Sequence, residues 1–188
     1  MVVLNSVSKY ALEFKMILNA IKFIRRVLKK MQRKARVVIV KKRCGGYTDR
    51  VQVGGPTSLT KNTFLGDNAN FNGLVISGEG NVIIGDNFHS GPDCLFICQN
   101  HNFDNGSAVP YDSTYILKDI TIEDNVWLGS RVIVLGGATI GEGAIIQAGS
   151  VVVSDIPKYA IAGGHPAKVF SSRDVTHYEK LKAEGKFH

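Results

Sequence analysis

Large aliphatic residues recur at every sixth position in the second half of the chain. Steps of six reach Ile116, Ile122, Leu128, Val134, Ile140, Ile146 and Val152. The residues four positions after these are apolar or small, namely Ile120, Val126, Val132, Ala138, Ala144, Ser150 and Ile156. A period of six is neither the period of a helix nor the simple alternation of one strand, so residues 116–157 form an internal repeat.

This repeat predicts a coil of short strands joined by tight bends. Each six-residue side points one large aliphatic inward and places a smaller residue at the next inward position, while Gly129, Gly141 and Gly149 serve the bends. A single coil cannot bury its own apolar side, so neighbouring coils must stack. The predicted fold is therefore mainly β, a parallel β-helix of hexapeptide repeats.

A looser version of the repeat precedes the regular one and is separated from it by a polar stretch. Residues 99–115 break the pattern, and His101 stands at the base of this excursion. Polar excursions from a regular scaffold are where function tends to sit. We predict a β-helix domain over residues 44–170 that contains the excursion, followed by a C-terminal helix or tail over residues 171–188.

The N-terminal segment, residues 1–43, has a different character. Thirteen of its residues are Lys or Arg and one is acidic, a balance of +12, whereas residues 44–188 have a balance of −5. Apolar residues spaced by three and four predict an amphipathic helix over residues 9–34, and Val37–Val40 read as a short strand. The helix either packs on its own domain or lies on an anionic membrane surface. No recognised nucleic-acid-binding motif accompanies the basic residues, which disfavours a nucleic-acid partner.

Compartment is predicted from the cysteines and the N-terminus. Cys44, Cys94 and Cys98 are an odd, loosely spaced set, typical of reduced thiols in a cytoplasmic protein. Lys and Arg interrupt the N-terminal apolar residues and no small-residue cleavage site follows, so the segment does not resemble a signal peptide. The expected location is the cytoplasm, with peripheral contact at the inner membrane surface if residues 9–34 bind lipid.

Four motifs then occur in an order that resembles a known family. They are Asn70-Phe71-Asn72 with His101 further on, Asn125-Val126-Trp127-Leu128-Gly129, Ala148-Gly149-Ser150-Val151-Val152 before Asp155-Ile156-Pro157, and Ala162-Gly163-Gly164-His165-Pro166-Ala167-Lys168-Val169. These motifs resemble the hexapeptide-repeat acyltransferases, and among them the galactoside and maltose acetyltransferases. The resemblance implies a left-handed β-helix, acetyl-CoA as the acyl donor, and a homotrimer with active sites between subunits.

The resemblance also implies roles for individual residues. His101 would be the general base that takes the acceptor hydroxyl's proton, a task that suits imidazole, and Asp104 or Asp112 could orient its ring. Asn70 and Ser130 would face the acceptor or the developing oxyanion. The expected contacts of acetyl-CoA are Trp127, Ala148, Val153, Ser154 and Lys168. Many relatives have Thr-Lys where this chain has Val153-Ser154, so one phosphate-binding lysine is missing.

The N-terminal segment changes the expected acceptor. It is unlike the small-sugar enzymes and looks more like the acetyltransferases of capsule and lipopolysaccharide, which implies a role in polysaccharide biosynthesis. The expected function is O-acetylation of a sugar hydroxyl on a surface glycan or glycan precursor. The alternatives are an N-acetyltransferase of an amino sugar nucleotide and a noncatalytic, membrane-associated scaffold.

A metal enzyme resembling the γ-class carbonic anhydrases is disfavoured. Such a site needs several histidines that converge on Zn²⁺ with one position open. His89 and His101 are twelve residues apart, and no close second pair of ligands exists. We therefore expect no metal site.

Overall fold

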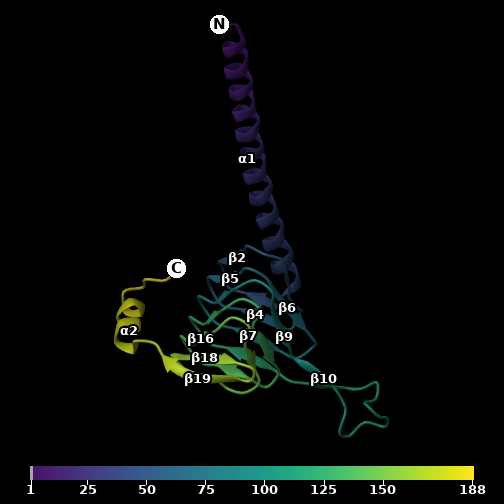
Figure 1. The fold of residues 1–188 in the computed structure, drawn as a ribbon. Helices are drawn as coiled ribbons and strands as arrows, with labels where there is room; N and C mark the ends of the chain where they lie inside the picture. The colour runs from purple at the N-terminus through teal and green to yellow at the C-terminus, as the bar shows by residue number, and fades with distance from the viewer. Residues whose placement is uncertain (1) are drawn as a thin grey trace. The chain divides into compact units, whose positions relative to one another are not determined.

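The protein is described by a computed structural model that places the backbone of residues 2–188 and the side chains of residues 14–188. It divides into two compact units, Met1–Ala35 and Arg36–His188. Helix α1 (Val2–Arg43) supplies the first unit and the beginning of the second. The second unit also holds every described strand and helix α2 (Val175–Ala183), as Figure 1 shows.

The predicted strand at Val37–Val40 is wrong, because the helix continues to Arg43. Helical spacing places Val37 and Val40 on the same side, where both pack against the hydrophobic core and Val40 is 1% exposed. Arg36 Nη1 also donates to the carbonyl oxygen of Gly54 over 2.7 Å. Core contact therefore decides the conformation of this β-branched stretch over its intrinsic strand preference.

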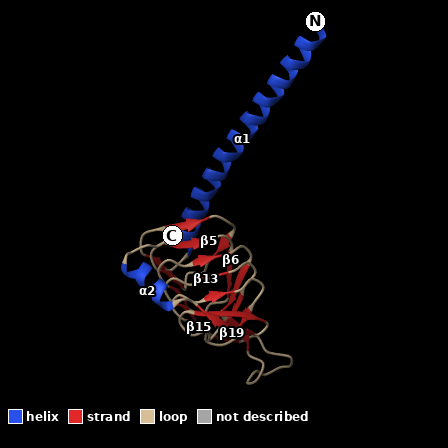
Figure 2. Cartoon of the chain, turned by 60° about the vertical axis from the view of Figure 1, so that its left-hand side comes forward, coloured by secondary structure: helices blue, strands red, loops and turns tan. Residues whose placement is uncertain are grey.

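Three parallel sheets form the sides of the β-helix, and Figure 2 shows their strands stacked in layers. The first face consists of β1 (Gly46–Tyr47), β4 (Thr63–Leu65), β7 (Val82–Ile84), β12 (Ile120–Ile122) and β15 (Thr139–Ile140). The second face consists of β2 (Val51–Val53), β5 (Ala69–Phe71), β8 (His89–Ser90), β13 (Trp127–Leu128), β16 (Ile145–Ile146), β18 (Ala160–Gly164) and β19 (Ala167–Ser172). The third face consists of β3 (Thr57–Ser58), β6 (Leu74–Ser77), β9 (Cys94–Ile97), β14 (Ile133–Leu135) and β17 (Val151–Val152).

The strand register explains the six-residue period. Trp127 pairs with Ile145 on the second face, and Ile133 pairs with Val151 on the third, so each partner is three hexads along the chain. The inward positions from Ile120 to Ile156 are all buried, as the repeat predicts. Ile116 is the exception. It lies half-buried in β11 (Tyr115–Leu117), which belongs to a hairpin outside the coils.

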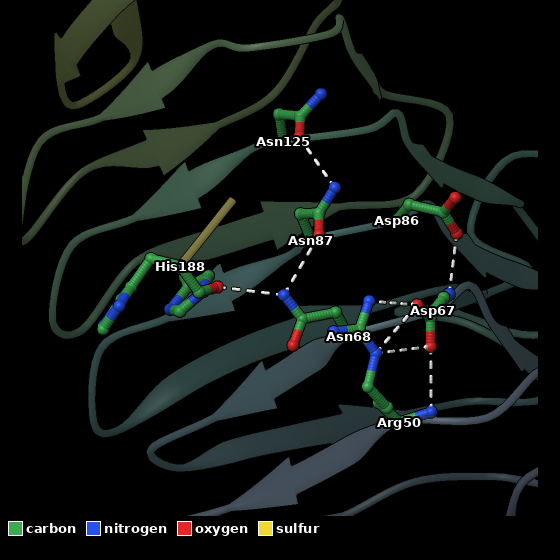
Figure 3. Close-up of polar contacts among 8 residues, drawn as sticks. Arg50, Asp67, Asn68, Asp86, Asn87, Asn125 and His188 are labelled. Atoms are coloured by element: carbon green, nitrogen blue, oxygen red, sulfur yellow. Dashed lines mark hydrogen bonds and ion pairs between the residues drawn. The ribbon is translucent and has the colours of Figure 1, made fainter. Parts of the chain in front are cut away.

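Asparagines mark the corner between the first and second faces. Asn68, Asn87 and Asn125 all have φ near the left-handed region, at 55°, 54° and 60°, a conformation that asparagine tolerates better than most residues. The side-chain amide of Asn68 donates to Asn87 over 3.0 Å, and that of Asn87 donates to Asn125 over 3.0 Å (Figure 3). This ladder satisfies polar groups along the corner and fixes how consecutive coils stack.

Two elements interrupt the regular coils. After β9 the chain forms β10 (Gln99–His101), which pairs antiparallel with β11, and residues 102–114 form the loop between them. At the end of the β-helix, β18 and β19 also pair antiparallel, which closes the second face. The excursion predicted at residues 99–115 is therefore a hairpin whose loop leaves the coils, as both ribbon views show (Figures 1 and 2).

Candidate active site

A row of outward-pointing side chains runs along the second face. The strand register aligns Asn70 with His89, His89 with Trp127, and Trp127 with Ile145. Their chain neighbours are buried, so period-two alternation turns these four side chains to the outside. Trp127 is 52% exposed, which leaves its ring available to a ligand. The structure therefore brings two predicted site residues, Asn70 and Trp127, onto one surface.

Ser130 and Ala148 lie at the next corner, between the second and third faces. The amide N–H of Gly149 donates to the carbonyl oxygen of Ser130 over 2.8 Å, which holds the two bends together. A Cβ on Gly129 would come within 2.5 Å of the backbone nitrogen of Ala148, so this bend needs a glycine. Ser130, an expected acceptor residue, and Ala148, an expected acetyl-CoA contact, are therefore neighbours in the fold.

His101 has a different environment, at the end of β10. Its ring stacks on Tyr111 with ring centroids 3.8 Å apart and an interplanar angle of 16°. Tyr115, its register partner on β11, lies 4.8 Å away at 38°. The imidazole is exposed and is oriented by aromatic contact. The sequence did not point to these tyrosines, because Tyr111 reaches His101 only through the fold of the loop.

Hydrogen bonds to Asp112 order that loop. The carboxylate accepts from the backbone N–H of Ser107 and of Thr114, each over 2.9 Å, and from the Thr114 hydroxyl. These bonds, with that from the Thr114 hydroxyl the strongest, lower the pKa of Asp112 to about 2. Asp112 therefore holds the loop that carries Tyr111, and its hydrogen bonds are to loop groups and not to His101.

His101 and the row on the second face do not meet within one chain. β10 follows β9 of the third face, while Asn70 and Trp127 lie on the second face. In Figure 1 the β10 hairpin leaves the coils on the side away from α2, β16 and β18. One chain thus presents its candidate base and its candidate acceptor residues on different surfaces.

The remaining predicted cofactor contacts are exposed and spread over two surfaces. Val153 and Ser154 follow β17, at the end of the third face. Lys168 lies in β19 opposite Gly163 of β18, on the second face. The three residues are accessible to a ligand, but a single chain does not gather them with Trp127 into one contact surface.

A cavity of about 720 Å³ lies beside Trp127, between the second face and the C-terminal segment. Its lining includes Trp127 and His89 from the strands and Tyr178 and Lys182 from α2. The sequence does not predict this cavity, because no local signal indicates that residues 171–188 fold back over this face. Part of the segment is held by Asn68, whose side-chain amide donates to the carbonyl oxygen of His188 over 2.9 Å (Figure 3).

Polar contacts to Glu142 fix α2 in place. Tyr178 donates to this carboxylate over 3.0 Å, and Lys182 forms an ion pair with it. Burial raises the pKa of Glu142, but the hydrogen bonds from Lys182 and Tyr178 outweigh burial, and the pKa lies below its ordinary value. Glu142 is therefore charged at neutral pH and anchors the helix that covers one side of the cavity.

Cys94 and Cys98 lie in the hydrophobic core. Both are buried, and burial raises the pKa of each thiol, which disfavours the nucleophilic thiolate. Cys94 Sγ also lies 3.3 Å from the carbonyl oxygen of Gly129. Among the described residues, no group of three His, Cys, Asp or Glu side chains is arranged to hold a metal ion.

Comparison with known proteins places this geometry in a class. The family model described as bacterial transferase hexapeptide (six repeats) matches residues 119–154. A solved galactoside acetyltransferase in complex with coenzyme A is 31% identical, with a TM-score of 0.65 over 77% of this chain and 73% of that one. A hexapeptide-repeat acetyltransferase from Vibrio cholerae is 30% identical, with a TM-score of 0.63 over 74% of this chain and 80% of that one. The fold and the family match thus define a hexapeptide-repeat transferase with a left-handed β-helix.

The similarity to the galactoside O-acetyltransferase of Escherichia coli indicates which kind of hexapeptide-repeat transferase this chain is. The Escherichia coli protein is 36% identical over 133 residues, which cover 65% of this chain and 62% of that protein. The chain belongs to the hexapeptide-repeat acetyltransferases. The predicted family, fold and class of enzyme are therefore confirmed. The Vibrio cholerae protein has also been solved in complex with acetyl coenzyme A.

Proposed function

We propose that the protein transfers the acetyl group of acetyl-CoA to a sugar hydroxyl of a surface glycan or glycan precursor, with His101 as general base. The observation that carries the proposal is the exposed imidazole of His101, held between Tyr111 and Tyr115 on a hairpin outside the coils. The complexes of relatives with coenzyme A and acetyl coenzyme A support the choice of donor. The similarity to a galactoside O-acetyltransferase supports a sugar hydroxyl as acceptor.

The reaction needs no covalent enzyme intermediate. One imidazole nitrogen of His101 takes the proton of the acceptor hydroxyl as its oxygen attacks the thioester carbonyl carbon. The tetrahedral intermediate carries its negative charge on the former carbonyl oxygen, where the side-chain amide of Asn70 or backbone N–H groups of a neighbouring coil would donate hydrogen bonds. The intermediate collapses by cleaving the C–S bond, and the imidazolium returns its proton to the departing CoA sulfur.

The active site is proposed to form between subunits of a homotrimer. His101 lies on the β10–β11 hairpin, whereas Asn70 and Trp127 lie on the second face, so one chain cannot use all three together. A neighbouring β-helix whose hairpin approaches the second face would complete the site. In this arrangement Trp127, Ala148 and Ser130 line the approach to the thioester, and Val153, Ser154 and Lys168 contact the outer part of acetyl-CoA.

Calorimetric titration with acetyl-CoA tests the donor and separates binding from chemistry. We expect saturable binding that weakens by roughly tenfold in Lys168→Ala, because one charge contact to phosphate is lost. His101→Ala should keep binding. Lys61→Ala removes a comparably exposed lysine from a surface ion pair and is the matched control. Absence of binding by the parent protein up to millimolar ligand would favour the noncatalytic scaffold.

Release of CoA in the presence of candidate acceptors tests the reaction. Galactosides, glycan oligosaccharides and amino sugar nucleotides should be compared, because turnover of the last group alone would replace O-acetylation with N-acetylation. We expect His101→Ala to lower kcat by about 10²–10⁴-fold, the usual contribution of a general base. His165→Ala removes another exposed imidazole and should retain the parent rate.

A further inference from the structure

The part of α1 between Phe14 and Ala35 is strongly charged and amphipathic. It contains eight Lys or Arg and no acidic residue. Apolar side chains lie at spacings of three and four and stay 39–63% exposed, namely Phe14, Ile17, Leu18, Ile21, Ile24, Leu28 and Met31. In the unit Met1–Ala35 the helix is the single described element, so nothing in that unit covers the apolar side. A helix in water would not leave such a stripe open without a partner surface.

The side of α1 that packs against the β-helix core is not this apolar stripe. The contact is made near the end of the helix by Arg36 and Val40. Steps of seven residues back along the same helical side reach Lys29 and Arg33, and a further step reaches Lys22 and Arg26, all basic. The sequence therefore continues the core-packing side mainly as a basic side, and the apolar stripe of residues 14–31, apart from Leu18, lies on other positions of the helix.

We propose that this stripe docks on an anionic lipid membrane, with residues 14–35 lying in the plane of the interface. The apolar side chains would enter the boundary between headgroups and acyl chains, and the basic side chains would contact anionic headgroups. No helix among the described residues is long and apolar enough to cross a membrane, so the helix lies along the surface. Charge complementarity selects this occupant over the alternatives.

A second copy of the helix fits less well. Two or three identical helices packed through the apolar stripe would leave the eight cations of each helix with no acidic residue between Phe14 and Ala35 to pair with. A nucleic acid would satisfy the cations but would leave Ile17, Ile24 and Leu28 in water. An anionic bilayer offers acyl chains to the apolar stripe and negatively charged headgroups to the basic side chains.

Sedimentation of the full chain with vesicles tests the proposal without any use of acetyl-CoA, so its failure is separate from failure of the acetyl-transfer proposal. Vesicles of phosphatidylcholine alone are compared with vesicles in which roughly one third is phosphatidylserine. We expect at least tenfold stronger partitioning to the anionic vesicles, reduced by added salt. Equal partitioning to both, or none to the anionic vesicles, would overturn the proposal.

Two double variants separate the contribution of the apolar stripe to vesicle binding from the contribution of the basic side chains. Ile17→Gln with Ile24→Gln should reduce partitioning at least tenfold, whereas Ile17→Leu with Ile24→Leu keeps the apolar area and should bind like the parent. Far-ultraviolet circular dichroism checks that both pairs keep their helix content. An unchanged affinity in the Gln pair would overturn insertion of the stripe. A Gln pair that loses its oligomeric state, with no vesicle binding by the parent, would instead assign the stripe to a helix–helix contact.

Discussion

His101 shows how a single side chain can be positioned without a carboxylate partner. Its ring lies flat on Tyr111 and tilted against Tyr115, so two aromatic faces restrict its rotation. Aromatic contacts of this kind contribute about 0.5–1.5 kcal/mol. Tyr111 reaches His101 from the far end of the hairpin loop, which means that the order of the loop controls the orientation of the candidate base.

We predict that Tyr111→Ala lowers kcat by roughly tenfold, because the imidazole loses the contact that orients it. Tyr111→Phe keeps the ring and should retain most of the parent rate. The KM for acetyl-CoA should stay unchanged in both. Steady-state kinetics of CoA release give both quantities, and a Phe variant as slow as the Ala variant would assign the role to the hydroxyl instead of to stacking.

The pH dependence of the loop follows from Asp112. Its pKa is about 2 in the folded protein and 3.8 ordinarily, so the folded loop favours the carboxylate. A lowered pKa means that the stabilisation is complete above pH 3.8 and is lost as pH falls through about 2. We expect the hydrogen-exchange protection of the Ser107 and Thr114 amides to decline over that window. In Asp112→Asn the protection should be low and nearly independent of pH, while Asp104→Asn in the same loop should behave as the parent does.

At the scale of elements, each short strand contributes through the side chains that it points inward. Ile84 and Ile83 are neighbours in β7, with exposures of 1% and 51%. Strand alternation thus places one in the core and the other on the surface. The same alternation, repeated over three faces, makes the β-helix core continuous from coil to coil.

Ile84→Ala should lower the free energy of unfolding by about 2–5 kcal/mol, since it removes buried methyl groups and leaves a cavity between stacked coils. Ile83→Ala removes the same atoms from the surface and should change it by less than about 1 kcal/mol. Urea denaturation at one fixed protein concentration measures both, because a fixed concentration keeps any contribution of self-association constant. Similar losses in the two variants would mean that a neighbouring chain covers Ile83 in solution.

The elements also show which features could be read from the sequence. The buried positions of the six-residue repeat from Ile122 to Val152 were predictable, because a regular fold repeats the same burial at a fixed period. The predicted strand at Val37–Val40 failed because a helix with the same residues gains core contact. Ile116 has the spacing of the six-residue repeat, yet its strand pairs with β10 outside the coils. Periodicity alone therefore cannot distinguish a residue that belongs to the β-helix core from one that has the same six-residue spacing but lies outside the coils.

The site was harder to predict than the fold. The residue types were found from motifs, but their surroundings depend on contacts between distant parts of the chain. Tyr178 and Lys182 fix α2 on Glu142, about two coils away in sequence, through polar contacts that have no periodic signal. The stacking of Tyr111 on His101 depends in the same way on the fold of a 13-residue loop, residues 102–114. Such pairings become visible only when the chain is folded.

At the scale of the whole molecule, the separation of His101 from the second face makes a sharp prediction. If each site combines His101 of one subunit with Asn70 of the next, two differently inactivated chains can complement each other. Chains carrying His101→Ala and chains carrying Asn70→Ala should each be slow as pure oligomers. Co-expressed in equal amounts with different tags, they should form mixed trimers in which roughly one third of the interfaces pair an intact His101 with an intact Asn70.

Tandem purification on the two tags, followed by CoA-release assays, measures the recovery. Activity per site near roughly one third of the parent value requires shared sites, because a site within one chain would always contain one of the two substitutions. A matched mixture of His101→Ala chains carrying either tag supplies the control, since no interface in it has an intact base. Complementation at the expected level would show that the hairpin of one chain and the second face of another work as one unit, and its absence would overturn the proposal that His101 and Asn70 of neighbouring chains share a site. The result would therefore decide whether the fold acts alone or only as an assembly.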